Sequence, residues 1–373
     1  MKIAYITTLN PHNKHSWSGT NYYTLKSLEK QGHSVYCIYN VHSASLWQKI
    51  KAKVLKVFGF IWLPERTIKF SKEYAKKIKP LLQPNTDVIL SLGTMPVAHL
   101  KTDIPIYIYV DDIFEHFRTY YGMGNLTRSC IDEANIVEQR AIDNCCKIIS
   151  CSNVTGAAIL DHYKLDKTKL EIVPLGANID VYPTKEEVDN YIALRERNKC
   201  KILFVGVESK RKGFDIVLDT AKILSDRKFP VEVHICGLRD LPSDLPKYVI
   251  NHGFVNKSTQ EGLDVLNELY STSHFLFVPS RAESYGLVFC EASAFALPSI
   301  SHKTGGVMTI VKDGVNGQLF DIGTSPNVFA EYIMQQFNDY ESYICLAKSS
   351  YNRFCQELNW EVAAQRLTAV MQR

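Results

Sequence analysis

The sequence predicts an α/β protein that consists of two doubly wound domains. A chain of 373 residues is too long for one core of ordinary size, so two domains are expected. Short runs of β-branched and aromatic residues alternate with helical patterns, which is typical of parallel strands buried on both faces. A charged stretch divides these runs into two series and reads YPTKEEVDNYIALRERNKC. It marks the region of the domain boundary.

The first series contains five expected strands and begins at the start of the chain. The strands are KIAYITTL (2–9), SVYCIYN (34–40), DVILSLG (87–93), IPIYIYV (104–110) and KIIS (147–150). Between the first two strands, GTNYYTLKSLEKQG has the apolar spacing of a helix that ends at Gly32.

The second series contains four expected strands. They are KILFVGV (201–207), VEVHICG (231–237), HFLFVPS (274–280) and PSISH (298–302). We expect a first domain at 1–178, a second at 179–355, and a final helix at 356–373 that crosses back to the first domain. Two such domains would face each other across a deep cleft at the carboxyl ends of both sheets, where ligands of doubly wound proteins bind.

Composition indicates a soluble globular protein in a reducing compartment. Hydrophobic residues make up 46% and charged residues 22%, and the net charge of +4 is too small to argue for nucleic acid. Ten cysteines are scattered without metal-ligand spacing, which suits free thiols. The N-terminus MKIAYITTLN does not resemble a signal peptide, and the longest apolar run of the basic region, VLKVFGFIWL, is too short to span a bilayer. A cytoplasmic protein is expected.

One segment is strongly basic. Between Lys49 and Lys79 there are ten Lys or Arg residues against two acids. Aromatic and aliphatic side chains interleave with the lysines across residues 47–79, which suits a peripheral contact with an anionic membrane surface. The alternative is a helical insertion whose lysines are solvated, and Trp47 and Trp62 could equally be core residues.

Positive charge is concentrated in the turn after the expected strand 201–207. Arg211 and Lys212 precede Gly213 and the start of a helix, whose free backbone amides add further donors. Together they favour an anion site, most naturally for phosphate, although a solvated basic turn is the alternative. Neither a Walker lysine motif nor GxGxxG is present in the sequence, so a P-loop or dinucleotide fold has no motif support.

The stretch SRAESYGLVFCEASAFALP places two carboxylates beside an apolar strand. Glu283 falls in a loop, and Glu291 falls about one and a half turns into a helix expected to start near Gly286. A buried carboxylate must be paired or hydrogen-bonded, and Glu291 could accept both hydroxyls of a ribose. With free amides at the helix start, this describes a nucleotide-sugar pocket. The alternative is that Glu291 bonds to a neighbouring strand or loop and that Glu283 is solvated.

Two glycine-rich turns follow the expected strand 298–302. Gly305 and Gly306 lie in KTGGVM, and Gly314 and Gly317 lie in VKDGVNGQLF. Such glycines allow the backbone to approach a ligand closely, or they only form a tight bend.

The ordered set of motifs resembles that of the retaining family 4 glycosyltransferases, which have the GT-B fold of two Rossmann-like domains. ESYGLVFCE matches their Glu-x7-Glu motif, and FVGVESKRKGFDIVLDTAKIL resembles their diphosphate loop. IVPLGANID resembles their interdomain segment, GGVMTIVKDGVNGQLF their C-terminal loop, and GTNYYTLKSLEKQGH their first N-terminal helix. The resemblance covers most of the chain.

The resemblance implies roles for charged residues at a donor site. Lys212 would pair with the donor diphosphate, helped by Arg211, in the loop that begins at Gly206. Glu291 would bind the ribose hydroxyls, and Glu283 would face the transferred sugar.

It also implies contacts made by backbone and apolar groups. Gly19 would let the N-terminal domain approach the diphosphate. Phe254 and Val255 would lie near the base. Sugar hydroxyls and phosphate would be held by backbone amides of Ser284, Tyr285, Gly286 and Leu287.

The sequence departs from the family pattern at two places. The arginine that usually follows the glycine of the diphosphate loop is replaced by Val207, and Arg211 is a candidate to supply that charge. A histidine common in the loop after the strand at 104–110 is replaced within DDIFEH, where Asp111 or Asp112 takes roughly its place, with His116 further on. Either aspartate could orient an acceptor hydroxyl, whereas Asp112 could equally cap the helix IFEHFRTYY.

The expected function is therefore transfer of a sugar from a nucleoside-diphosphate-sugar to a glycan, lipid-linked or small-molecule hydroxyl. The resemblance implies a retaining hexosyltransferase of bacterial-type surface polysaccharide or glycoconjugate synthesis. Lys212, Arg211 and helix N-termini can stabilise the leaving diphosphate without a metal, so no cofactor is expected beside the nucleotide-sugar co-substrate. The alternatives are a non-catalytic nucleotide-sugar or glycan-binding protein and a GT-B-type nucleotide-sugar epimerase.

Overall fold

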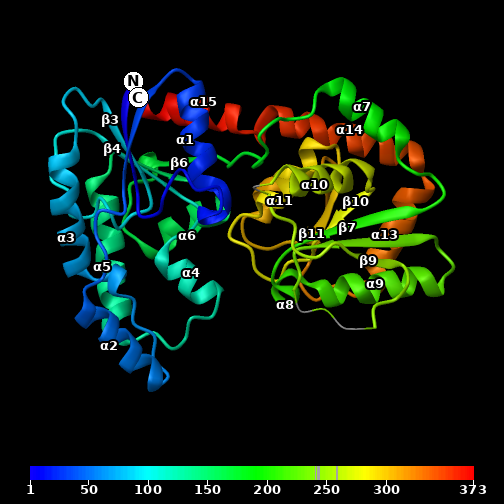
Figure 1. The fold of residues 1–373 in the computed structure, drawn as a ribbon, viewed down its shortest axis with the longest axis horizontal. Coiled ribbons are helices and arrows are strands. Elements are labelled where there is room, and N and C mark those ends of the chain that lie inside the picture. The colour runs from blue at the N-terminus through cyan, green and yellow to red at the C-terminus, as the bar shows by residue number, and fades with distance from the viewer. Residues whose placement is uncertain (240, 242–243, 258) are drawn as a thin grey trace. The chain divides into compact units, whose positions relative to one another are not determined.

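The computed structural model describes residues 1–239, 241, 244–257 and 259–373, and it divides into two compact units. The first unit consists of Met1–Leu175 together with Trp360–Arg373, and the second consists of Gly176–Asn359. Within the described residues, each unit contains its own six-stranded sheet with helices around it (Figure 1).

The strands of the first sheet are all parallel. They are β1 (Lys2–Thr7), β2 (Ser34–Tyr39), β3 (Val88–Leu92), β4 (Ile106–Val110), β5 (Lys147–Ser150) and β6 (Leu170–Ile172). Their spatial order is β2-β1-β3-β4-β5-β6, so the strand order reverses between β1 and β3. At such a reversal the connections leave in opposite directions and open a crevice at the carboxyl ends of the strands.

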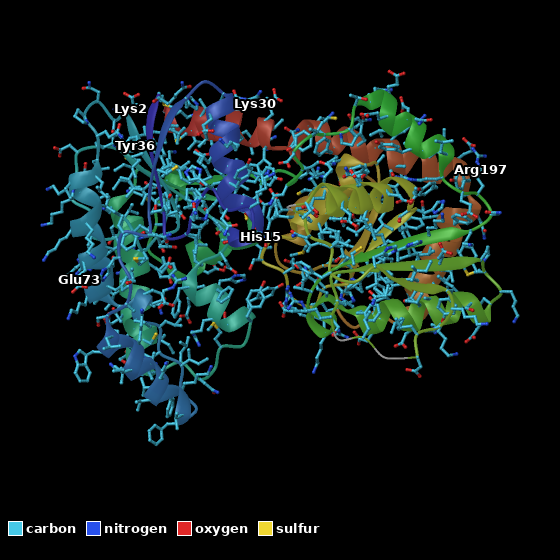
Figure 2. The ribbon with its side chains drawn as sticks, in the orientation of Figure 1. Lys2, His15, Lys30, Tyr36, Glu73 and Arg197 are labelled. Carbon is cyan, nitrogen blue, oxygen red and sulfur yellow. The ribbon has the colours of Figure 1, made fainter. Side chains whose placement is uncertain are left out.

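The register of the first sheet is visible at its first strand pair. Ile3 lies opposite Val35 on one side and opposite Val88 on the other. Lys2 at the start of β1 lies beside Tyr36 of β2, with its ammonium 5.8 Å from the centre of the ring (Figure 2). The long side chain of Lys2 therefore covers an aromatic ring near the end of the sheet while its charge stays at the surface.

Seven helices are described in the first unit. They are α1 (Thr20–Lys30), α2 (Leu46–Val57), α3 (Ile68–Ile78), α4 (Phe114–Tyr120), α5 (Arg128–Asn144), α6 (Asn153–His162) and α15 (Trp360–Met371). Several begin at a hydroxyl side chain that accepts a hydrogen bond from a first-turn amide, as at Ser45, Thr67, Thr127 and Ser152. The short 3-10 turns are Ser16–Gly19, Pro64–Arg66, Lys79–Leu81 and Lys167–Lys169.

The core of the first unit lies against both faces of its central strands. Every residue of β3 and β4 is buried, which explains why VILSL and IYIYV carry apolar residues without interruption. Helix α5 contributes Val137, Ala141 and Ile142 to this core. Helix α15, from the end of the chain, packs against α1 (Figure 1). The His33 ring lies 2.7 Å from the Thr368 hydroxyl.

The second sheet is also fully parallel. Its strands are β7 (Cys200–Val205), β8 (Val231–Cys236), β9 (Val249–Asn251), β10 (Phe275–Phe277), β11 (Ser299–His302) and β12 (Gly317–Phe320). The order is β12-β11-β10-β7-β8-β9, and the reversal falls between β7 and β10. The loops after β7 and β10 are therefore the ones that border the crevice of this sheet.

The helices described in the second unit cover both faces of its sheet. They are α7 (Lys185–Leu194), α8 (Ser209–Lys212), α9 (Phe214–Asp226), α10 (Gln260–Thr272), α11 (Leu287–Ala294), α12 (Val307–Ile310), α13 (Pro326–Asn338) and α14 (Tyr340–Glu357). The charged stretch near residue 190 forms α7. Arg195 follows this helix and is buried, where its guanidinium donates to the carbonyl oxygens of Phe295 and Ala296 at 2.8 Å.

All nine strands that the sequence predicts are confirmed. Strands β6, β9 and β12 were not predicted; each is short and lies at or near the edge of its sheet. All ten cysteines lie within the described residues and are free thiols.

The basic segment contains both an exposed helix and a buried anchor. No residue of α2 is buried, and Trp47 and Val57 are 80% and 83% exposed. Trp62, in contrast, packs with Phe114 and Leu126 in a small apolar cluster. Trp62 is thus a core residue, whereas Trp47 is not. Among the described helices, none has the length and apolar character needed to cross a bilayer.

Candidate functional site

The loop after β7 packs directly against the loop after β10. Gly213 has a φ of 74°, and a Cβ at this position would lie 2.2 Å from the carbonyl oxygen of Pro279. The amide of Arg281 donates to the carbonyl oxygen of Arg211 at 2.8 Å. Glycine permits this approach because it has no Cβ and adopts positive φ at little cost. The basic turn is therefore held against the loop that carries Glu283.

Lys212, Arg211 and Glu283 come together in this place. Lys212 is buried, and its ammonium donates to the Glu283 carboxylate. The Arg211 guanidinium lies 3.4 Å from the same carboxylate oxygen and donates to the carbonyl oxygen of Ala282 at 3.0 Å. Its other end donates to Glu208 at 2.9 Å, which lowers the pKa of that carboxyl. Glu283 is thus a paired carboxylate rather than a solvated one.

The start of this loop contains Gly206 and Val207. A Cβ on Gly206 would lie 3.0 Å from Cγ of Lys212, so the glycine leaves room for the lysine stem. Val207 is 60% exposed and brings no charge. The positive charge of the loop therefore comes from its later residues, Lys210, Arg211 and Lys212.

Glu291 is the buried carboxylate of α11. Only 2% of its side chain is exposed, and Lys257 donates to its two oxygens at 2.7 and 2.6 Å. The Tyr270 hydroxyl of α10 donates to it at 2.9 Å, and burial together with this carboxylate raises the pKa of the phenol. The protein therefore satisfies Glu291 through a lysine and a tyrosine, while 45% of the Lys257 side chain remains exposed.

Helix α11 begins where the sequence predicts, at Leu287, with Gly286 at a φ of 100° as its N-cap. Of the four amides expected to hold a ligand, those of Ser284 and Tyr285 precede this cap. The amide of Gly306 donates to the carbonyl oxygens of Glu283 and Ser284, and a Cβ there would lie 2.3 Å from the latter oxygen. The paired glycines after β11 thus allow a close approach to the protein's own loop.

Phe254 and Val255 follow β9 in the second unit. The Phe254 ring is 55% exposed, and the Arg239 guanidinium lies 5.3 Å from its centre. Val255 is half-buried. An exposed aromatic ring beside a guanidinium offers two flat surfaces on which a nucleobase can stack.

The first unit contains a cavity of about 420 Å³ at the reversal of its own sheet. It lies at the ends of β1, β3 and β4, where Thr7, Leu92 and Val110 line it. Its volume falls in the range of roughly 300–1,000 Å³ that is usual for small-molecule sites.

Asp111 and Asp112 both line this cavity. Asp111 accepts a hydrogen bond from the indole of Trp17 at 2.8 Å, and burial raises the pKa of Asp111 to about 6. Asp112 accepts from the ring of His116 at 2.7 Å and from the Ile113 amide at 2.8 Å. The pairing with Asp112 raises the pKa of His116. The N-cap residue of α4 is Ile113, whose amide is the one that donates to Asp112.

Gly19 is the N-cap of α1, with a φ of 88°. Trp17 and Ser18 before it also have positive φ, at 49° and 53°, which is uncommon for residues with a side chain. Such strain accumulates at functional sites. Gly19, Asp111 and Asp112 belong to the first unit, and the other predicted site residues belong to the second.

Asn21, Arg66 and Glu138 are among the cavity-lining residues that sequence reasoning missed. Glu138 is buried and accepts hydrogen bonds from Arg66 and from the Thr94 hydroxyl, both at 2.9 Å. Its position on the apolar face of EANIVEQRAID was the available signal, because an ionisable residue among core positions needs a partner. Asn21 had no such signal. Lys257 was also missed.

No group of three or more His, Cys, Asp or Glu side chains in the described ranges is arranged to hold a metal ion.

Two parallel sheets, each with polar groups at its strand reversal, define a protein of the GT-B glycosyltransferase class. Residues 20–181 match the family model described as Glycosyltransferase Family 4, and residues 187–353 match Glycosyl transferases group 1. The two matches together cover most of the chain, and the chain belongs to glycosyltransferase family 4.

Solved structures share the fold. Sucrose-phosphate synthase from Thermosynechococcus elongatus is 17% identical, with 100% of this chain and 98% of that chain covered and a TM-score of 0.70. Anabaena HepE in complex with UDP-glucose is 14% identical, with 100% and 99% covered and a TM-score of 0.63.

Among curated proteins, a D-inositol 3-phosphate glycosyltransferase of Paenarthrobacter aurescens is 24% identical over 213 residues. The match covers 55% of this chain and 52% of the relative. The chain thus spans about half the length of this curated relative.

Proposed function

We propose that this protein transfers a sugar from a nucleoside-diphosphate-sugar to an acceptor hydroxyl, with retention of configuration. One observation carries the proposal: two carboxylates of the same loop and helix, Glu283 and Glu291, each hold a lysine. A nucleotide-sugar brings phosphates that attract the lysines and hydroxyls that donate to the carboxylates. Membership of family 4 supports the same reaction.

Lys212 and Arg211 are the groups proposed to receive the leaving diphosphate. Negative charge develops on this group as the bond to the sugar breaks, and fixed positive charges lower the energy of that state. Both side chains are held by Glu283 before the donor arrives. The carboxylate would then turn its oxygens to hydroxyls of the transferred sugar. The amides of Ser284 to Leu287 would complete the sugar and phosphate contacts.

Glu291 is proposed to bind the ribose. Its carboxylate has acceptor positions for two hydroxyl donors, and the partly exposed Lys257 is the partner that can leave. The base would stack at Phe254, close to Val255. HepE, which shares the fold, was crystallised with UDP-glucose, so UDP is the first nucleotide to test.

The acceptor is proposed to bind in the cavity of the first unit. Asp111 and Asp112 line this cavity and can accept a hydrogen bond from the hydroxyl that attacks the sugar. Gly19 would admit the donor diphosphate near the start of α1. No metal ion is required in this proposal, because Lys212, Arg211 and helix N-termini supply the positive charge.

A peripheral contact with the inner face of a membrane is a second part of the proposal. Helix α2 places Trp47, Val54 and Val57 at the surface between four lysines and buries none of them. Apolar side chains among cations suit an anionic lipid surface, into which they insert while the lysines meet the headgroups. The contact would place a cytoplasmic enzyme near lipid-linked acceptors of surface-glycan synthesis.

Thermal unfolding with UDP, GDP, ADP, CDP and dTDP tests the donor site. A nucleotide present at a hundred times its Kd stabilises by about 2.7 kcal/mol, which is visible as a shift in Tm. Donor turnover with an acceptor panel, and the anomeric configuration of the product by NMR, test transfer and retention. Binding without turnover would instead support the non-catalytic reading, and conversion of the donor without acceptor would support an epimerase.

A further inference from the structure

We infer that the cavity of the first unit selects an uncharged, hydroxyl-rich ring, such as a neutral monosaccharide unit or an unphosphorylated cyclitol, and rejects a phosphorylated one. The inference rests on the proposed function, since it names the class of acceptor. It is drawn from the polar groups, charges and aromatic residues that line the cavity.

Asn21 is the group that points to a ligand. It is completely buried, it lines the cavity, and neither the oxygen nor the nitrogen of its side-chain amide has a hydrogen-bond partner. An amide buried without partners is costly, so such groups are rare in folded proteins. An amide offers two donors and one acceptor, which matches adjacent hydroxyls that can both donate and accept.

The charges around the cavity oppose a second anion. Four carboxylates line it, from Glu65, Asp111, Asp112 and Glu138, and among the described lining residues Arg66 alone carries a permanent positive charge. That guanidinium is already paired with Glu138 at 2.9 Å. Burial raises the pKa of both Asp111 and Glu138, which shows that the surroundings of these carboxylates already disfavour negative charge. A phosphate dianion here would add repulsion and find no unpaired cation.

Aromatic side chains contribute apolar surface to the same cavity. Trp17, Phe70 and Tyr74 line it. The indole nitrogen of Trp17 donates to Asp111, and the Tyr74 hydroxyl donates to the carbonyl oxygen of Thr7 at 3.0 Å. What these rings offer a ligand is therefore carbon surface. A sugar or cyclitol ring combines CH groups that pack on carbon with hydroxyls that reach Asn21 and the carboxylates.

One feature could favour a phosphate instead. The N-terminus of α1 begins beside Asn21, and its first turn contains no acidic residue. Free amides at a helix start attract anions. We infer that repulsion by the four carboxylates exceeds the attraction of these amides, and the experiment below decides between the two effects.

The test uses the full chain at pH 7.5 and matched pairs of rings. The probes are myo-inositol with inositol 3-phosphate, and methyl glucoside, galactoside and mannoside, each with its 6-phosphate. Binding is measured by ligand-observed NMR, with the nucleoside diphosphate that stabilises the protein added to the same sample. At least one neutral ring should bind, and its phosphorylated counterpart should bind at least about tenfold more weakly. Tighter binding of a phosphorylated member would overturn the inference and favour the start of α1.

Two variants distinguish an effect on the cavity from an effect on folding or on the donor site. Asn21→Ala should abolish binding of the neutral ring while the Tm stays the same or rises, because the replaced amide makes no hydrogen bond in the free protein. Glu138→Gln keeps an acceptor for Arg66 and Thr94 but removes one negative charge. It should raise the ratio of phosphate to neutral affinity about tenfold. An unchanged ratio would contradict the electrostatic argument even if Asn21→Ala proved unstable.

Failure of this inference is distinguishable from failure of the proposed function. If the nucleoside diphosphate binds and no neutral ring does, the acceptor assignment is wrong and the donor site stands. If no nucleoside diphosphate binds, the proposed function itself fails, whatever the rings do.

Discussion

Lys257 holds both oxygens of the buried Glu291 carboxylate, at 2.7 and 2.6 Å. A ribose diol would need the same two oxygens. The lysine can move away because 45% of its side chain is exposed, whereas the glutamate is fixed in α11 with 2% exposed. Lysine and ribose therefore compete for one carboxylate, and variants of the two residues should act on donor binding in opposite directions.

Glu291→Gln should weaken binding of the nucleoside diphosphate by roughly ten- to a hundredfold. The reason is that a hydrogen bond to a charged group contributes about 1.5–3 kcal/mol, and the amide accepts at one oxygen only. Titration calorimetry with the nucleotide that raises the Tm gives the Kd directly. Glu261→Gln, on the exposed start of α10, is the matched control. An unchanged Kd for Glu291→Gln would remove the ribose assignment.

Lys257→Met should lower the free energy of unfolding and tighten nucleotide binding. Without the ammonium the buried carboxylate keeps only Tyr270, which costs about 1–3 kcal/mol in the free protein. A ribose would then no longer compete with the lysine, so the shift in Tm with nucleotide should exceed that of the unmodified protein. Lys222→Met, an exposed lysine of α9, should change neither quantity. Weaker nucleotide binding by Lys257→Met would show that this lysine assists the donor rather than competing with it.

Lys212→Ala should reduce turnover by about 10² to 10³, the usual cost of removing one group that stabilises developing negative charge. Lys212→Arg keeps the charge and should retain more activity than alanine. Because Lys212 is buried against Glu283, circular dichroism must first show that each variant is folded. Wild-type turnover in a folded Lys212→Ala protein would exclude the lysine from the mechanism.

Asp111→Asn should stabilise the protein at neutral pH and lose this effect in acid. Burial raises the pKa of Asp111 to about 6, above its ordinary 3.8, so the folded state binds the proton more tightly than the unfolded chain. Ionised Asp111 therefore disfavours the fold above pH 6, by up to about 3 kcal/mol, and this penalty fades between pH 6 and 4. Urea denaturation from pH 4 to 8 measures it. An increase in the free energy of unfolding that does not change with pH would contradict the raised pKa. Asp219→Asn, exposed on α9, is the control.

Removal of the apolar residues of α2 should abolish binding to anionic vesicles without affecting the fold. Trp47 and Val57 are 80% and 83% exposed, so Trp47→Ser with Val57→Ser removes surface that contacts little in the protein. Sedimentation with phosphatidylserine-containing and with purely zwitterionic vesicles measures the contact. Binding should need the anionic lipid and weaken with salt, since exposed charges are screened beyond about 8–10 Å at physiological ionic strength. If the double variant and the unmodified protein sediment equally with anionic vesicles, α2 has no role in the contact.

Much of the fold could be predicted because its strands are buried on both faces. Runs such as VILSL and IYIYV carry an apolar pattern that does not depend on distant contacts. Strand β9 could not be predicted in this way, since two of its three residues are exposed. Its place depends on pairing with β8, which is a long-range contact.

Some residues of the site could likewise be predicted from the sequence, and others could not. The resemblance placed Lys212, Arg211 and Glu283 at one donor site, and the structure brings them together because loops after neighbouring strands meet at one edge of a parallel sheet. Lys257 could not be placed, because nothing in NKSTQ indicates that its side chain reaches a carboxylate in α11. Asn21 could not be identified from the sequence for a different reason. Its importance lies in the absence of a hydrogen-bond partner, and that becomes visible only when all the surrounding atoms are known.

The pairing of α15 with α1 has a consequence for the architecture of the gene. The first unit is assembled from both ends of the chain, whereas the second is one continuous segment, Gly176–Asn359. The second unit is therefore an insertion within the first, and it can be excised or exchanged as a single piece of coding sequence. Deleting the last helix would instead expose a face of α1 and damage the first unit, although the cut lies directly beside the second unit in the sequence.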